Sequence, residues 1–451
     1  LEFRRVLFRS EKLFQLKKHN TNVRTEVIGG LTTFFAMAYI IFVNPNFLSQ
    51  TGMDHTAVML ATCVSAAIGC FLTAFMANVP FAQAPGMGLN AFFTYTICFG
   101  MGYTWQQGLA IVFISGLIFL AISISPIRKQ IIDSIPAPLK AAISAGIGLF
   151  ICLIGLLNAG IVTAGNNLLD LSSITSGPAL LALIGLIITG ILMAWKVKGA
   201  LFIGILVTTV IGIPMGVTNL SNVSISFEGI SIAPTFFKLS FVGLLSKGIL
   251  PLLTAIVTFA MCDCFDTVGT LIGTAGSAGM LDENGNLPRG DKALIADAVA
   301  TCTGALMGTS TVTTFVESST GISEGARTGL SSVVVGILFL LGCVLAPIAG
   351  IIPSAATAPA LIIVGMFMIG NVAKIDWSDV EVALPCFLTI AMMPFAYSIS
   401  DGIGFGFISY TLIKMARGKF KEVPVLLYIL SALFVVMYIL EIGRASCRER
   451  V

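Results

Sequence analysis

Runs of about twenty apolar residues follow one another along almost the whole chain, and each is long enough to cross a bilayer as a helix. The composition agrees, because 56% of the 451 residues are hydrophobic and only 10% are charged. Soluble globular domains carry about 25% charged residues, so that class is excluded. The sequence therefore predicts an all-α polytopic membrane protein.

The apolar runs predict about fourteen transmembrane helices. They lie at 27–47, 56–78, 83–100, 106–125, 138–159, 177–195, 198–216, 247–273, 291–308, 311–325, 328–349, 357–373, 381–398 and 401–417. A further apolar stretch, 424–440, either lies along the membrane interface or spans a last time. The third and tenth spans contain helix-breaking residues, so we expect a short extended segment in each.

Basic residues indicate which loops face the cytoplasm, because cytoplasmic loops carry an excess of Lys and Arg. Apart from the ends of the chain, alternate loops divide these residues seventeen to two, with only Lys238 and Lys247 on the second side. This division predicts a protein of the cytoplasmic membrane whose N-terminus is cytoplasmic. The net charge of +3 is small and dispersed, so we expect no nucleic-acid partner.

The polar stretch 217–246 is the longest interruption and divides the chain into seven spans plus seven. An odd number of spans means that the two halves, 11–216 and 247–417, enter the membrane from opposite sides, as inverted repeats do. A weak internal similarity supports this, since Ile-Pro at 135–136 and at 352–353 both precede a Gly-containing apolar run, 217 residues apart. We therefore expect two inverted repeats joined by an extracytoplasmic connector.

The two ends of the chain differ from the rest. Residues 1–10, LEFRRVLFRS, and residues 441–451 are rich in Arg and lack the apolar pattern of their neighbours, so we expect both to be non-native flanks. Residues 418–440 form a C-terminal apolar segment. Acidic residues at the cytoplasmic loops are expected to need only solvation; they are Asp282, Glu283, Asp376, Asp379 and Glu381.

Neither a metal site nor a cofactor is expected. His19 and His55 lie in predicted loops, and the ten cysteines are scattered without a CxxC pair.

The stretch Thr309–Ile322, TSTVTTFVESSTGI, places Glu317 inside sequence that otherwise belongs in lipid. One acidic side chain at the centre of a membrane helix costs roughly 2.5 to 3.5 kcal/mol, so Glu317 should face a polar cavity or a partner. The many Thr, Ser and Val residues suit a short extended piece. We interpret the stretch as part of a substrate site; the alternative is a polar helical turn packed against other helices.

The matching stretch in the first half is FAQAPGMGLNAFF, residues 81–93. Pro85, Gly86 and Gly88 interrupt a helix there, and Asn90 lies 227 residues before Glu317. In each half, an extended piece would lead into a half-helix whose first N–H groups point at a ligand. The alternative for Asn90 is a hydrogen bond between helices.

A second acidic group lies in TFAMCDCFDTVGTLIG, residues 258–273. Asp263 and Asp266 are three residues apart, on one face of a helix, so at least one can hold a proton in a medium of low dielectric. Asp297 lies within another predicted span and is a further candidate. We therefore expect proton coupling to involve Asp266, Glu317, Asp297 or Asp263.

Five motifs resemble the azaguanine-type hypoxanthine/guanine permeases, a branch of the nucleobase/cation symporters. The motifs are EVIGGLTTFFAMAYIIFVNP at 26–45, APGMGLNAFF at 84–93, FDTVGTL at 265–271, TSTVTTFVESSTGI at 309–322 and APALIIVG at 358–365. The resemblance implies a fold of two inverted repeats arranged as core and gate domains, a homodimer, and transport driven by protons. It implies no enzymatic activity.

The resemblance also implies which residues bind the substrate. Asn90, Asp266 and Glu317 correspond to the substrate-site residues of the family, and amides near Leu89 and Val316 would contact the base. We assign four neighbours to the same site, namely Gly86, Gly88, Thr267 and Ser318. Asp263 lies outside the family motif.

The chemistry of these residues fits a purine. An ionised carboxylate can accept two N–H donors, such as the N1–H and amino group of guanine, whereas adenine presents an acceptor at N1. We therefore expect a symporter that imports hypoxanthine and guanine with protons, or alternatively with sodium. The remaining alternatives are an adenine-preferring permease, an anion transporter of the same architecture, and an intramembrane aspartyl protease. The last needs an Asp pair on two helices, which is absent from the 258–273 pattern.

Overall fold

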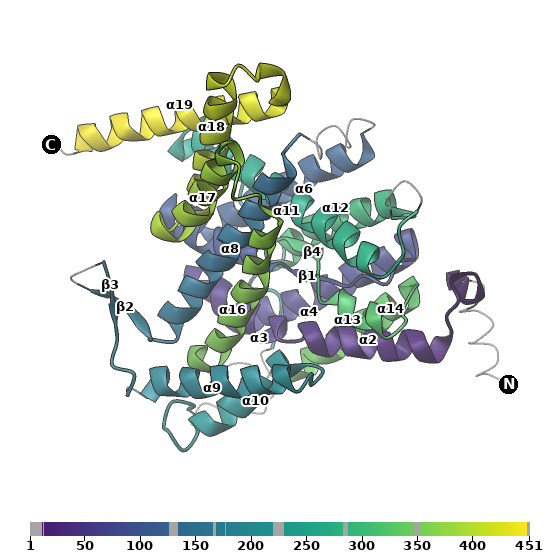
Figure 1. Cartoon of the computed structure of the whole chain (residues 1–451). Helices are drawn as coiled ribbons and strands as arrows, with labels where there is room; N and C mark the ends of the chain where they lie inside the picture. Colours follow the sequence, from purple (N-terminus) through teal and green to yellow (C-terminus); the bar gives the residue numbers. More distant parts are fainter. Residues whose placement is uncertain are drawn as a thin grey trace.

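The structure is a computed structural model and describes residues 11, 13–125, 134–165, 168–175, 177–219, 230–282, 287–346 and 351–448 (Figure 1). The expected flank at 1–10, part of the connector and Glu283 lie outside the described residues. At the other end, helix α19 (Val425–Arg448) continues through most of the second expected flank.

In the first half of the chain the helices follow one another in the predicted order. Its elements are α2 (Val23–Met37), α3 (Ile40–Leu48), α4 (His55–Leu72), β1 (Gln83–Pro85), α5 (Met87–Ala91), α6 (Trp105–Ile124), α8 (Ala137–Asn158), β2 (Val162–Gly165), β3 (Leu168–Leu171), α9 (Gly177–Ala194) and α10 (Ala200–Gly212). Wider π-helical turns extend α4 over Thr73–Ala77 and α5 over Phe92–Gly100.

The second half repeats the arrangement. Its elements are α11 (Ile249–Ser277), α12 (Gly290–Met307), β4 (Val312–Thr314), α13 (Ser318–Ser323), α14 (Gly329–Gly342), α16 (Ser354–Ile369), α17 (Val380–Phe395), α18 (Ile399–Ala416) and α19. Short 3₁₀ turns lie at Leu16–His19, Ser49–Thr51, Leu244–Lys247, Cys343–Leu345, Gly370–Lys374 and Phe420–Glu422.

Each predicted span coincides with a helix or, at 83–100 and 311–325, with a strand that leads into a helix. Within the described residues, seven helices are long and apolar enough to cross a membrane, and several shorter apolar helices accompany them. The expected helical membrane fold with two broken spans is therefore confirmed. The hairpin of β2 and β3 was not predicted, because its residues fall in an expected loop.

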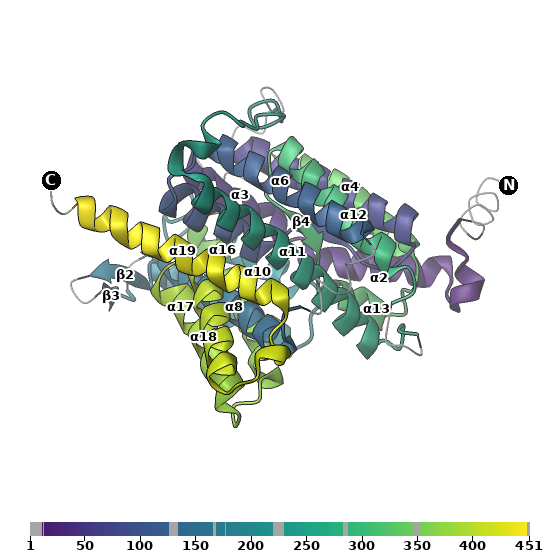
Figure 2. The ribbon, with the colours of Figure 1, turned by 90° about the horizontal axis from the view of Figure 1, so that it is seen from above.

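The helices form two groups that alternate along the chain (Figures 1 and 2). Helices α2 to α6 pack with α11 to α14, and we call this group the core domain. Helices α8 to α10 pack with α16 to α18, and we call this group the gate domain. Figure 2 shows α4, α6 and α12 on one side of the molecule and α8, α17 and α18 on the other.

A buried carboxylate anchors α2 to the start of α14. Glu26 is fully buried, and its oxygens accept hydrogen bonds from the backbone N–H groups of Arg327 at 2.8 Å and Ser331 at 3.2 Å. The first N–H groups of a helix have no partner within that helix, and a negative charge there is favourable. Glu26 therefore caps a helix some 300 residues away in the chain.

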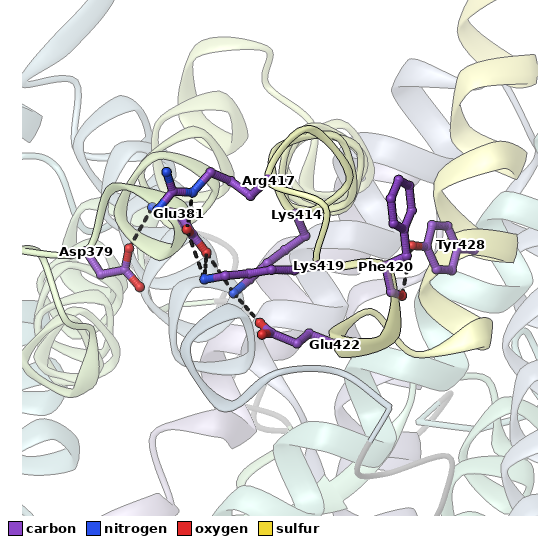
Figure 3. A network of polar contacts seen from close by, with 8 residues as sticks. All are labelled: Asp379, Glu381, Lys414, Arg417, Lys419, Phe420, Glu422 and Tyr428. Carbon is purple, nitrogen blue, oxygen red and sulfur yellow. Dashed lines mark hydrogen bonds and ion pairs between the residues drawn. The ribbon is translucent and has the colours of Figure 1, made fainter.

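An ion-pair network joins the ends of α17 and α18 (Figure 3). Glu381 accepts from Lys414 at 3.0 Å, from Arg417 at 2.7 Å and from Lys419 at 2.8 Å, and Lys414 also contacts Glu422 at 2.8 Å. Because Glu381 is only 8% exposed, the expectation that solvation alone accounts for it is wrong. Its charge is balanced by basic residues that arrive from α18 and the following turn.

Helix α19 packs against α18 in the opposite direction. Ser431 contacts Thr411 at 2.9 Å, and the hydroxyl of Tyr438 donates to the carbonyl of Asp401 at 3.2 Å. Later residues of α19 thus lie beside earlier residues of α18.

Candidate functional site

The two broken spans meet at the centre of the core domain (Figure 1). Strands β1 and β4 pair antiparallel, with Gln83 opposite Thr314 and Pro85 opposite Val312. One backbone hydrogen bond extends the ladder at each end, from Gly86 to Thr311 and from Phe315 to Ala82. The pairing satisfies backbone groups that lipid could not, so irregular backbone is tolerated at this depth.

Local sequence explains why the two spans break. Pro85 has no N–H and disfavours a helical residue before it, and the Thr residues of β4 are β-branched. A Cβ at Gly86 would lie 2.6 Å from Thr313 Cγ2, and one at Gly88 would lie 2.6 Å from Ile147 Cγ2. Both glycines therefore permit close approach, the first between the strands and the second between the core and gate domains.

Two carboxylates near the paired strands are exposed or half-buried. Glu317 is the residue before α13 and is half-buried, and Asp266 on α11 is exposed. They are close enough for their charges to act on each other. Val316, beside Glu317, is 54% exposed, so protein does not cover the site at α13 or at Asp266 of α11. We call Asp266 and Glu317 the front pair.

The exposed face of α11 continues from Asp266 toward the C-terminal end of the helix. Gly269, Gly273 and Gly276 are exposed at helical spacing, and nothing lies within 4 Å of a Cβ built at either of the first two. This end of α11 precedes Arg289 and Lys292, which belong to the predicted cytoplasmic loops. The exposed face of α11 therefore runs from Asp266 toward the end of the helix that precedes a loop we predict to be cytoplasmic.

A third carboxylate, Asp297 of α12, contacts both strands and is fully buried. One oxygen accepts from Gln83 Nε2 at 3.2 Å and from Thr314 Oγ1 at 2.8 Å. The other accepts from Thr267 Oγ1 at 2.8 Å. Asp297 thus connects both strands to α11, and its described partners are an amide and two hydroxyls rather than a basic residue.

Asp263 is the fourth carboxylate and is 1% exposed. Its Oδ2 accepts from Thr301 Oγ1 at 2.8 Å, whereas its Oδ1 has no partner among the described residues. Thr267 also contacts Thr313 at 2.8 Å, so hydroxyls fill the space between the two buried acids. We call Asp263 and Asp297 the rear pair.

The remaining predicted site residues differ in their burial and in their hydrogen-bond partners. Asn90 is fully buried; its Oδ1 accepts from Ser310 at 2.6 Å and its Nδ2 has no partner among the described residues. Leu89 is buried, and Ser318 accepts from the backbone N–H of Ala82 at 3.0 Å. Thr267 lies with the rear pair rather than beside Asp266.

Sequence reasoning missed two side chains that contact these acids. Tyr39, between α2 and α3, donates to Glu317 Oε1 at 2.8 Å, and Gln83 donates to Asp297. Tyr39 lies within the motif at 26–45 and Gln83 directly precedes the motif at 84–93, but neither has a charge that marks it in an apolar run. Four carboxylates with mostly neutral donors suit the binding of a polar, uncharged ligand together with a cation.

The fold is shared with solved anion transporters. The transmembrane domain of a cyanobacterial bicarbonate transporter, BicA, superposes with a TM-score of 0.65, covering 84% of this chain and 97% of that one. The two sequences are 17% identical, so the likeness concerns the fold alone.

Sequence comparisons identify nearer relatives. The guanine/hypoxanthine permease PbuG of Bacillus subtilis is 45% identical, over 94% of this chain and 98% of the relative. The adenine permease AdeP of Escherichia coli is 41% identical, over 94% of this chain and 95% of the relative. The model of the xanthine/uracil permease family, described as a permease family, matches residues 24–405. The chain therefore belongs to this family of permeases and is a nucleobase transporter by descent, not an enzyme.

Proposed function

We propose that this protein imports hypoxanthine and guanine across the cytoplasmic membrane together with protons. The observation that supports this most directly is the front pair, since Asp266 is exposed and Glu317 is half-buried within spans that are otherwise apolar. Acidic side chains persist at membrane depth where a ligand or a cation meets them. Neighbouring permeases of the family transport guanine and hypoxanthine in one case and adenine in another.

Glu317 is the principal contact to the base in this proposal. An ionised carboxylate can accept both the N1–H and the amino group of guanine, or the N1–H of hypoxanthine. The unpartnered Nδ2 of Asn90 is a donor suited to O6 or N7. Backbone amides near Leu89 and Val316 complete the site, with Gly86 and Gly88 allowing the close packing that brings these segments together.

Transport requires the site to open to each side of the membrane in turn, and we assign this to movement of the core domain against the gate domain. The contact between them includes a small, mostly apolar cavity between α11 and the helices α8, α18 and α19, lined by Ile143, Phe265, Phe407 and Phe434 among others. The contact is mostly apolar, and the buried hydrogen bond recorded across it among the described residues, between Thr258 Oγ1 and Ser400 Oγ, is long at 3.5 Å, so sliding costs little. In this movement the core domain would carry the base past α8. We also propose that the N-terminus lies on the cytoplasmic side and that the protein assembles as a homodimer.

Asp266 is the preferred proton carrier, because it is the acid that solvent reaches most freely. Asp297 is fully buried and receives three donors, an arrangement suited to a structural role. Sodium in place of the proton is the alternative coupling ion, and replacement of sodium by choline in the uptake buffer distinguishes the two.

Uptake of radiolabelled hypoxanthine by cells that lack their own purine carriers tests the proposal. We expect uptake to collapse on addition of a protonophore. Glu317→Gln should reduce it about 100-fold, the effect of losing hydrogen bonds to a charged group, and Asp266→Asn should abolish accumulation while leaving exchange of base. Glu324→Gln is a matched control, because Glu324 lies seven residues after Glu317 in an exposed ion pair with Lys198 at 2.8 Å. Such pairs contribute at most about 1 kcal/mol, so this variant should keep its activity.

Two other substrate classes give different results in the same assay. Competition by unlabelled adenine stronger than by guanine would identify an adenine permease. Bicarbonate or sulfate uptake without purine uptake would identify an anion transporter, which the acidic front pair argues against because it repels anions.

A further inference from the structure

Tyr39 is the closest described protein partner of the carboxylate that we assign to the base. It lies where α2 gives way to α3, in a turn with backbone hydrogen bonds from Ile41 to Ala38 and from Phe42 to Tyr39 itself. The side chain is 1% exposed and its ring is packed in the main hydrophobic cluster. Its hydroxyl lies 2.8 Å from Glu317 Oε1, although the two residues are 278 positions apart.

This hydrogen bond acts on the chemical form of Glu317. A phenol that donates to a carboxylate stabilises the ionised carboxylate, and the interaction is stronger where water is excluded. The buried ring of Tyr39 has little freedom to move, so the donor is held in place. Glu317 is thereby maintained as a group that accepts hydrogen bonds and does not donate them.

The form of Glu317 decides which purines fit. Hypoxanthine and guanine carry a hydrogen on N1 and donate to an ionised carboxylate. Adenine carries a lone pair on N1, which an ionised carboxylate repels and a protonated one binds as a donor. A site that leaves a buried polar atom without a partner rejects the mismatched ligand strongly.

We infer that Tyr39 is a specificity-determining residue, which favours 6-oxopurines over adenine by keeping Glu317 an acceptor. The inference deepens the proposed function and rests on it, because it requires Glu317 to face the base. It also leaves the transported proton to another acid, in agreement with the assignment to Asp266.

Replacement of Tyr39 by Phe tests the inference, since it removes the hydroxyl and keeps the ring. The measurement is the inhibition constant of adenine divided by the KM of hypoxanthine, both from initial rates of uptake. A charge-assisted hydrogen bond corresponds to tenfold or more in an equilibrium constant, so we expect this ratio to fall about tenfold in Tyr39→Phe. A purely structural role would lower uptake of all bases and leave the ratio unchanged.

Tyr103→Phe is the matched control. Tyr103 is 3% exposed, and its hydroxyl donates to the carbonyl of Leu244 at 3.3 Å. The variant therefore also loses a buried hydrogen bond, but one that does not involve the four carboxylates. An unchanged ratio in Tyr39→Phe, or an equal fall in both variants, would overturn the inference. If Tyr39→Phe takes up no base, the ratio is measured by thermal stabilisation of the purified protein with hypoxanthine and with adenine, and the same criterion applies. Absence of purine uptake by the unaltered protein would instead refute the proposed function.

Discussion

The front and rear pairs of carboxylates belong to the same core domain but differ in their exposure and in the donors that reach them. Asp266 is exposed and Glu317 is half-buried, with one Tyr hydroxyl donating to the latter. Asp297 and Asp263 are buried and receive hydroxyl and amide donors from α11, α12 and both strands. The front pair therefore retains acceptors for a ligand, whereas most of the acceptors of the rear pair are already used.

The difference follows from the cost of burying charge. A carboxylate removed from water needs donors to replace its hydration, and the protein supplies them to the rear pair. Near the front pair water and a transported base can supply them instead. We therefore expect substitutions of the rear pair to act on stability and those of the front pair to act on transport.

The largest effect is expected when Asn replaces one Asp of each pair, Asp297 in the rear pair and Asp266 in the front pair. In Asp297→Asn one carboxylate oxygen becomes an NH₂ group, which faces side chains that donate hydrogen bonds to that oxygen in the unaltered protein. We therefore expect the free energy of unfolding to fall by about 3 kcal/mol. In Asp266→Asn it should change by less than about 0.5 kcal/mol, because exposed substitutions cost little. Thermal unfolding of the two purified variants in detergent measures the contrast. Equal melting temperatures would show that the rear donors are not structural.

The next effect concerns the coupling of transport to the membrane potential. One charge moved inward through 100 mV supplies about 2.3 kcal/mol, which accumulates a neutral purine roughly 50-fold. Proteoliposomes of the unaltered protein should reach this ratio at a potential of that size, whereas Asp266→Asn should only exchange base and reach a ratio of about one. Accumulation that persists in Asp266→Asn would move the coupling role to the rear pair.

A somewhat smaller effect is expected for Thr301, the described donor to Asp263. Thr301→Val keeps the shape and removes the hydroxyl, which leaves a buried carboxylate without that partner and should cost about 2 kcal/mol of unfolding free energy. The double variant Thr301→Val with Asp263→Leu removes both polar groups, so it should recover most of the loss. If the double variant is the less stable one, Asp263 has a second donor that matters more than Thr301.

The sequence alone predicts the broken spans and the acids of the front pair, because those features depend on local composition. Pro85 interrupts a helix wherever it lies, and Glu317 is conspicuous in an apolar run. Asp263 and Asp266 show the limit of the same reasoning. Their spacing predicts one face of a helix, yet the roughly 60° between them is enough to bury Asp263 and leave Asp266 exposed.

Other features depend on tertiary contacts that no local pattern encodes. Tyr39 reads as an ordinary core residue in AMAYIIF, and its role depends on Glu317 in the other half of the chain. Thr267 follows Asp266 directly and so was assigned to the substrate, but the next residue of a helix points about 100° away. Its hydroxyl therefore meets Asp297 instead. Glu381 was expected to be solvated because its basic partners lie at the end of α18 and just after it, more than 30 residues later.

Asn90 shares features of both pairs, and this provides the smallest of the expected effects. Like the rear pair it is fully buried and receives a donor, Ser310 at 2.6 Å; like the front pair it keeps an unused group, the Nδ2. Ser310→Ala frees the amide to rotate away from the base, so the KM for hypoxanthine should rise about fivefold, or roughly 1 kcal/mol. Ser323→Ala is the control, since that hydroxyl is exposed at the end of α13. A lower melting temperature with an unchanged KM would show that Asn90 has a structural role, like the rear pair.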